Sequence, residues 1–280
     1  MLGYNLIIIS ALFHSLWNIL LKKSNNKFFF NFYMHLANLF IFSFAYFIFF
    51  RRYLYIDKLT IFKAFVASTF FTFYHLFLSS AYSYGDISKL YPITAISPLF
   101  VTLWAVLFLK EKINIVSFIG IIFIVFGVAV IGNVKNIRIS KDKGVFYAIL
   151  AAFAYSLGAI VDKLGVGSGN FVLYVYSLTF FMTLYMFIFN YRVVKGKFVG
   201  YFRINVRKIF LGGGVLFFSF LTYRYGLKMV NVSYAIVLRQ VNIIFGVFLG
   251  CVLFREKITI NNIIGTIFII VGVSILRYYV

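Results

Sequence analysis

Acidic residues are scarce in this sequence. Six Asp and Glu accompany 27 Lys and Arg among 280 residues, and charged residues make up 12% of the chain. A soluble domain carries about 25% charged residues, whereas 63% of this chain is hydrophobic. Apolar runs of about 20 residues, long enough to span a bilayer, recur from one end to the other. The composition therefore excludes a soluble domain and predicts an integral membrane protein.

Cysteines, histidines and catalytic motifs are also scarce. The single cysteine, Cys251, excludes a disulfide or a cysteine metal site within one chain. The three histidines lie in separate apolar runs without carboxylate partners, so we expect no metal and no cofactor. The sequence holds no His-Glu-x-x-His, P-loop or Gly-x-Ser-x-Gly motif. We therefore expect no enzyme, although a membrane-embedded enzyme acting on a lipid or isoprenoid carrier and a non-transporting scaffold remain alternatives.

The basic residues give a formal net charge of +21. Such an excess can indicate nucleic-acid binding. Here, however, the Lys and Arg residues lie at the ends of apolar runs and in short connections, where they set orientation and contact anionic lipid. We expect a lipid bilayer and no nucleic acid as partner. The N-terminus lacks a basic region and an Ala-x-Ala site, so the first run is expected to be a retained helix.

A charged triplet occurs twice, and the residues that follow each copy also match. Shifted by 145, residues 111–130 overlie residues 256–275 without a gap. The matches include Glu111 with Glu256, Gly120 with Gly265 and Gly127 with Gly272. Similar apolar helices do not by chance place a charged triplet and two glycines in register. The chain is therefore interpreted as a duplicated membrane protein.

Ten membrane spans are predicted from the apolar runs. They cover approximately residues 3–21, 29–50, 61–82, 89–109, 113–132, 144–161, 171–190, 209–227, 233–254 and 259–277. The polar, basic segment 133–143 divides them into two repeats of five, residues 1–135 and 136–280. An odd number of spans inserts the second repeat upside down, so we expect an all-α membrane protein with a 5+5 inverted-topology repeat.

Arg239 is the sharpest candidate for function, because it lies inside the ninth span. It would bind an anion in a cavity, with Asn242 on the same face; alternatively, one carboxylate neutralises it or it extends to the interface. Shifted by 145, it overlies Thr94 in the fourth span. That span holds both prolines of the chain, Pro92 and Pro98, and we expect them to kink it, for a substrate site or for packing alone.

Polar residues also lie along the first span: His14, Asn18 and Lys22, with Trp17 beside them. His14 is expected either to carry a proton or bind substrate, or to be a buried histidine satisfied by a neighbour. The same two alternatives apply to His75 in the third span. For His35 in the second span we expect a structural role.

The first span also has a counterpart in the second repeat. Shifted by 141, Lys22 overlies Lys163, and His14 overlies Tyr155. Asp162, at the end of the sixth span, is expected to neutralise a buried cation such as Arg239 or to pair locally with Lys163. For Glu111, which is flanked by basic residues, we expect local ion pairing.

These features resemble the drug/metabolite transporter superfamily, EamA type. The resemblance rests on the five-plus-five duplication, with a glutamate at a helix end before a helix with two spaced glycines, at 111–127 and 256–272. More narrowly, the sequences at 14–18, 85–88, 91–93, 232–234 and 238–239 resemble one branch of EamA-type permeases. The resemblance implies helices around a central cavity and alternating access by rocking of the halves.

The function expected from the residues and the resemblance is secondary transport of a small polar metabolite, anionic or zwitterionic, across the bacterial inner membrane. Arg239 would hold a carboxylate or phosphate, Trp17, Tyr91 and Tyr234 would shape the pocket, and protons are a candidate coupling ion. The family places both termini in the cytoplasm, whereas the distribution of Lys and Arg favours the opposite orientation. Substrate, direction and oligomeric state stay open.

Overall fold

The computed structural model describes residues 1–50, 55–84, 90, 93–94, 96–131, 142–194, 198–254 and 258–279. The helices in these residues are α1 (Leu2–Lys22), α2 (Lys27–Phe49), α3 (Lys58–Tyr84), α5 (Ser97–Leu109), α6 (Ile115–Ile131), α7 (Lys143–Val166), α8 (Phe171–Val194), α9 (Phe198–Met229), α10 (Val232–Arg239), α11 (Asn242–Phe254) and α12 (Ile260–Tyr279). Because α10 and α11 together make one span, these helices correspond to the ten predicted spans. The all-α fold with ten spans is confirmed.

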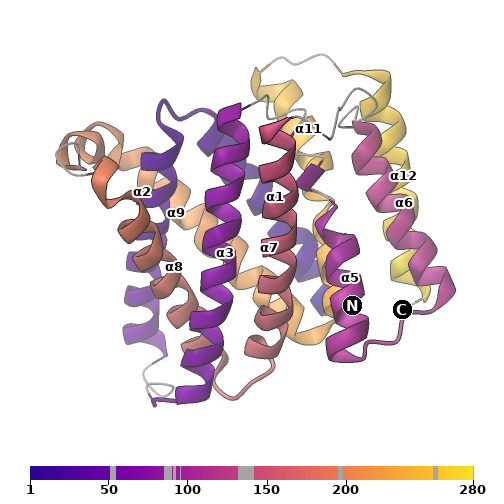
Figure 1. The fold of residues 1–280 in the computed structure, drawn as a ribbon, viewed down its shortest axis with the longest axis horizontal. Coiled ribbons are helices and arrows are strands. Elements are labelled where there is room, and N and C mark those ends of the chain that lie inside the picture. The colour runs from indigo at the N-terminus through magenta and orange to yellow at the C-terminus, as the bar shows by residue number, and fades with distance from the viewer. Residues whose placement is uncertain are drawn as a thin grey trace.

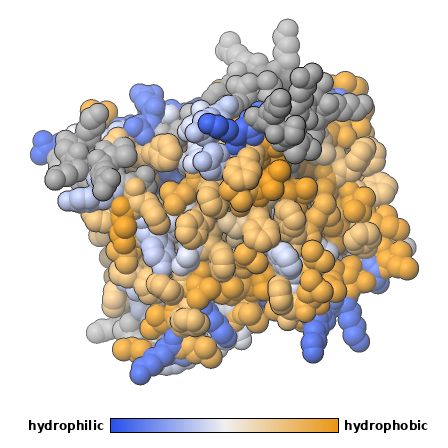
Figure 2. Space-filling view, in the orientation of Figure 1, coloured by the Kyte–Doolittle hydropathy of each residue, from blue (hydrophilic) through white to orange (hydrophobic). Residues whose placement is uncertain are grey.

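The outer surface of the helix bundle is apolar. Figure 2 shows a broad hydrophobic band with hydrophilic residues gathered toward the two ends. Large apolar side chains are exposed on the helices, among them Phe40, Phe44, Phe108 and Phe248. Seven spans in the described residues are long and apolar enough to cross a bilayer, and α5, α6 and α12 are shorter apolar helices. The band is therefore the surface that faces lipid.

The two repeats run in opposite directions, as α6 and α12 demonstrate. These helices pack side by side (Figure 1), with Gly120 against Gly272 and Gly127 against Gly265. Residue numbers rise along one helix as they fall along the other, so equivalent helices of the two repeats are antiparallel. A Cβ on Gly127 would lie 2.6 Å from the carbonyl oxygen of Gly265. The repeated glycines thus allow close backbone contact between the two halves.

The fourth and ninth spans are both interrupted, and at equivalent positions. In the ninth span, the amide of Val241 donates to the carbonyl of Leu238, 3.1 Å away, in the turn between α10 and α11. In the fourth span, the amide of Ile96 donates to the carbonyl of Ile93, also at 3.1 Å. Ile96 and Val241 are 145 residues apart, so each repeat breaks its fourth helix at the same place.

Proline can account for only one of these interruptions. Pro98 lies in the first turn of α5. Because it cannot donate to the carbonyl four residues earlier, it disrupts a continuous helix just ahead of itself, and the fourth span is interrupted there, at Ile96. The ninth span is interrupted without any proline. Pro92 lies outside the described residues.

Helix packing leaves a polar region at the centre of the bundle. The helix α3 packs on α7 and α8, α1 packs on α9 and α11, and α5 packs on α7 and α10. The amides of Leu59 and Thr60 donate to the carboxylate of Asp57, which precedes α3. The Thr60 hydroxyl donates to the same carboxylate and lowers the pKa of Asp57. Both chain termini lie in the lower half of Figure 1, at the same end of the bundle.

Candidate substrate-binding site

A cavity of about 40 Å³ lies where the two interrupted spans meet α1, α3 and α7. Its lining residues are His14, Tyr74, Thr94, Ser97, Tyr155, Ile236, Arg239, Gln240 and Asn242. Most of these side chains carry a hydrogen-bonding group.

Arg239, the last residue of α10, is held in this cavity by uncharged groups. Its Nη2 lies 3.0 Å from Nδ1 of His14, and its Nη1 donates to the hydroxyl of Tyr155 at 3.4 Å. The guanidinium also stacks over the ring of Tyr223, 4.1 Å from its centroid. Its Nε has no partner among the described residues, and no carboxylate of that part of the chain pairs with it. The site therefore presents a positive charge that an anion can neutralise.

His14 is an acceptor in this arrangement. Its Nδ1 faces Arg239 and also accepts from Nε1 of Trp17 at 3.3 Å. Because arginine and the indole N–H only donate, Nδ1 must keep its lone pair, and the proton of the neutral ring lies on Nε2. His14 therefore contacts Arg239 as a neutral acceptor. The Asn18 amide bonds back to the His14 carbonyl at 2.9 Å, so its contact is local to α1.

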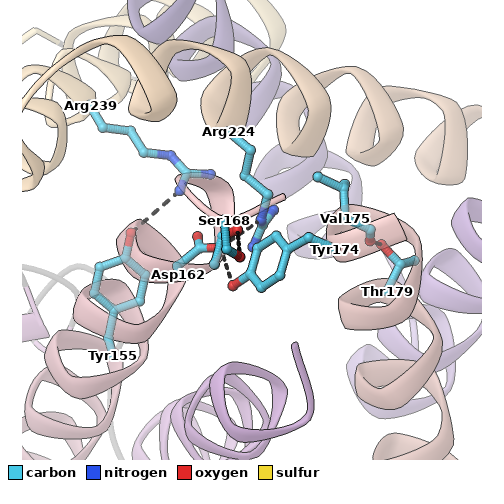
Figure 3. Close-up of polar contacts among 9 residues, drawn as sticks. Tyr155, Asp162, Ser168, Tyr174, Val175, Thr179, Arg224 and Arg239 are labelled. Atoms are coloured by element: carbon cyan, nitrogen blue, oxygen red, sulfur yellow. Dashed lines mark hydrogen bonds and ion pairs between the residues drawn. The ribbon is translucent and has the colours of Figure 1, made fainter. Parts of the chain in front are cut away.

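A separate, buried ion pair joins α7 and α9. Nε of Arg224 donates to Oδ1 of Asp162 at 3.0 Å, and the hydroxyl of Tyr174 donates to the same oxygen at 2.8 Å. Figure 3 shows Asp162 joined to Arg224 and Tyr174, while Arg239 is joined to Tyr155. Asp162 does neutralise a buried cation, but that cation is Arg224, and neither Arg239 nor Lys163 is its partner in this structure. Lys163 instead donates to the carbonyls of Leu227 and Val230, at 2.8 and 2.6 Å, where α9 ends.

The cavity is lined by equivalent positions of the two repeats. His14 and Tyr155, which overlie each other at the 141 offset, both contact Arg239. The 145 offset relates two more pairs in the lining, Thr94 with Arg239 and Ser97 with Asn242. A site on the pseudo-two-fold axis, at interrupted helices, is the arrangement by which inverted repeats hold a substrate near the middle of a membrane.

Known proteins share both the sequence pattern and the fold. The EamA-like transporter family matches residues 1–133 and 142–278. This chain belongs to the EamA-like transporter family. An uncharacterized transporter of Archaeoglobus fulgidus is 26% identical over 207 residues, which is 72% of each chain. A protein of known crystal structure superimposes with a TM-score of 0.77 at 14% identity, covering 100% of this chain and 98% of the other, a similarity of fold alone. The resemblance seen in the sequence is confirmed, and the protein is a multi-pass membrane transporter.

The residues predicted for substrate binding separate into three groups in this EamA-like transporter. Arg239, His14, Thr94 and Asn242 line the cavity. Trp17, Asn18, His75 and Tyr234 do not; Trp17 is buried beside His14, and Tyr234 packs in the apolar core with Ile121 and Val237. Tyr91, like Pro92, lies outside the described residues. The Ser15 hydroxyl, next to His14, donates to the carbonyl of Asn242 and ties α1 to α11.

Four further residues contribute that the sequence interpretation did not single out. Tyr74, Tyr155 and Tyr223 surround Arg239, and Arg224 forms the buried ion pair. Two signals could have found them. The repeat places Tyr155 on His14, and Arg224 is an ionisable residue inside a predicted span, as Arg239 is.

Glu111 joins the two repeats at the membrane face where the termini lie. Its carboxylate accepts from the amide of Val232 at 2.8 Å and from the amide and hydroxyl of Ser233 at 3.3 and 2.6 Å. These are the first residues of α10. Local ion pairing was expected for Glu111; the structure shows instead that it caps a helix of the other repeat.

Proposed function

We propose that this EamA-like transporter moves a small anionic or zwitterionic metabolite across the inner membrane by alternating access, with Arg239 binding its carboxylate or phosphate. One observation carries this proposal. Arg239 is a permanent cation in a central cavity, and among the described residues only uncharged groups contact it. An unneutralised charge within a membrane protein is costly, so a bound anion is strongly favoured there.

The surrounding side chains support this assignment. His14 and Tyr155 fix the guanidinium from opposite repeats, and the face of Tyr223 covers it. Thr94, Ser97, Gln240 and Asn242 supply polar atoms to the remainder of the lining. A zwitterion would place its anionic group on Arg239 and its ammonium group against hydroxyl and carbonyl oxygens. In this proposal the termini lie in the cytoplasm, as the family resemblance implies.

The proposal predicts that Arg239 is required for transport and not for folding. Purified protein in proteoliposomes would be tested with radiolabelled succinate, aspartate and glycerol 3-phosphate, which represent dicarboxylates, amino acids and phosphate esters. We expect Arg239→Ala to lower transport of the accepted compound about 100-fold, because a charge-assisted bidentate contact is lost. Arg239→Lys should retain part of the activity, since lysine keeps the positive charge but cannot form the two parallel hydrogen bonds of a guanidinium.

The matched control is Arg207→Ala, at an exposed arginine of α9, which should transport at the wild-type rate. Each variant is first shown to be monodisperse in detergent. A well-folded Arg239→Ala variant with wild-type transport would contradict the proposal.

A further inference from the structure

A second group of buried polar side chains lies outside the Arg239 cavity, on α2 and α3. Asn31, His35 and Asn38 occupy one face of α2 and are exposed by 9%, 0% and 0%, and His75 of α3 is exposed by 8%. The rings of His35 and His75 are 5.3 Å apart and nearly perpendicular, at 85°. Two histidines from different helices therefore meet inside the membrane-spanning bundle.

Hydrogen bonding within the described residues does not account for this group. Both ring nitrogens of His35, both amide atoms of Asn38 and Oδ1 of Asn31 have no partner there. A histidine with a purely structural role would bond at least one ring nitrogen, because buried polar groups are almost always paired. The structural role expected for His35 does not explain these atoms.

We propose that His35 and His75 together bind a proton that couples substrate movement to the proton gradient, with Asn31 and Asn38 as the polar groups beside them. This inference rests on the transport function proposed above. A proton on one imidazole makes its ring edge positive, and the perpendicular contact directs that edge at the electron-rich face of the other ring. His14 cannot take this role while its Nδ1 accepts from Arg239 and Trp17.

The groups that face the pair include no available carboxylate among the described residues, so the proton must come from water. The pair is faced by Trp17 and then His14 from α1, Tyr74 from α3, Thr183 from α8, and Phe220 with Arg224 behind it from α9. Arg224 is already paired with Asp162. No carboxylate of the described residues is therefore available to neutralise a charged pair, and a buried charge without a partner is costly. The pair can hold a proton only while water reaches it.

One small cavity marks the side from which water can reach the pair. This cavity of about 10 Å³, close to the space that one water molecule needs, is lined by Asn31 and His75 together with Phe28, near the start of α2, and Ser79, near the end of α3. It thus lies toward the membrane face opposite the termini. On the other side of His75, the ring of Trp17 lies between it and His14, with centroids 6.4 and 4.9 Å away. The pair would take a proton from water at the face opposite the termini while that face is open. It would release the proton to water at the other face once the halves have rocked and that face is open, in step with the anion site.

The test follows the proton itself. The chain has three histidines, so protein labelled with ¹⁵N-histidine in lipid nanodiscs gives three ring systems, which His35→Gln and His75→Gln assign. We expect His35 and His75 to titrate as a coupled pair, so that His35→Gln moves the midpoint of His75 by more than about one pH unit, and the reverse. The internal control is His14, which should stay the neutral Nε2–H tautomer.

A second measurement distinguishes a transport role from a structural one. The probe is whichever of succinate, aspartate and glycerol 3-phosphate depends on Arg239. An imposed pH gradient should accelerate its movement about tenfold in the wild type and leave His35→Gln and His75→Gln unaffected, while exchange at equal pH persists in both variants. Independent titration, no proton uptake by folded protein, or gradient-driven transport in both variants would overturn the proposal. Any of these three results would overturn the histidine proposal without affecting the assignment of Arg239. Conversely, if transport does not depend on Arg239, the titration of His35 and His75 can still be interpreted.

Discussion

Arg224 and Arg239 lie in neighbouring helices of the same bundle, and their surroundings give them different roles. Arg224 is 4% exposed and bonds to Asp162, which is fully buried. Arg239 faces a cavity and contacts only uncharged groups among the described residues. The first arginine is satisfied within the protein and the second is not, so we assign folding to one and binding to the other.

We predict that Asp162→Ala destabilises the protein by about 3 kcal/mol, because it leaves Arg224 as an unpaired buried charge. The measurement is thermal unfolding in detergent. Arg224→Met should cost a similar amount, since Asp162 and Tyr174 lose the group between them. The double variant Asp162→Leu with Arg224→Met should recover most of the loss, because removing both charges removes the desolvation penalty. Additive losses in the double variant would contradict a paired role.

At the scale of residues, the sequence identifies costly polar groups but not their partners. Arg239 could be selected because few charges occur inside apolar runs. The assignment of Asp162 to Arg239 failed, because only the packing of α7 on α9 shows that Arg224 lies closer. A structural role was expected for His35, and no sequence pattern shows that His75 meets it from another helix.

At the scale of elements, helices α6 and α12 relate the sequence repeat to the contact between the two halves. The glycines that revealed the duplication in the sequence are also the residues where the two halves touch. The sequence could indicate that Gly120, Gly127, Gly265 and Gly272 are equivalent. It could not show that they contact one another, because that depends on the antiparallel arrangement of the two helices.

We predict that Gly127→Ala lowers the stability of the protein by about 1–3 kcal/mol, the usual cost of overpacking. The new methyl group would lie 2.6 Å from the Gly265 carbonyl and 2.9 Å from Ile269 and Phe268, and a backbone carbonyl cannot move aside easily. The matched control is Gly214→Ala in α9, where a Cβ meets nothing within 4 Å. That variant should be neutral or slightly stabilised, since alanine favours helix. Equal melting temperatures for both variants in detergent would refute the close contact.

The interrupted spans show where prediction from local sequence ends. Prolines in the fourth span suggested a kinked helix, and the span is interrupted at Ile96, just ahead of Pro98, where a proline disrupts a helix. The ninth span has the same interruption at Val241 with no proline to indicate it. The repeat predicts the interruption of the ninth span better than the residue types do, because equivalent positions in the two copies adopt equivalent backbone conformations.

At the scale of the whole molecule, Glu111 connects the two halves at one membrane face. The Arg239 cavity lies at the C-terminal end of α10. At its N-terminal end lies a second cavity, of about 460 Å³, whose lining includes Lys63, Glu111, Lys163 and Asn231. The buried start of α10 separates the two cavities. The Glu111 carboxylate holds this start in place through three hydrogen bonds. The bonds thus stabilise a state in which the Arg239 cavity is closed toward the termini.

We predict that Glu111→Ala opens the Arg239 cavity to the face that carries the termini. Hydrogen bonds to a charged group contribute about 1.5–3 kcal/mol each, so losing three of them shifts the population of open and closed states more than about tenfold. The measurement uses Cys251→Ser protein with Gln240→Cys in the cavity lining, labelled by a membrane-impermeant maleimide from each face in turn. Glu111→Ala should raise the labelling rate from the face of the termini and lower it from the opposite face. Lys112→Ala, at an exposed neighbour of Glu111, should change neither rate, and equal rates in all three proteins would show that Glu111 does not control access.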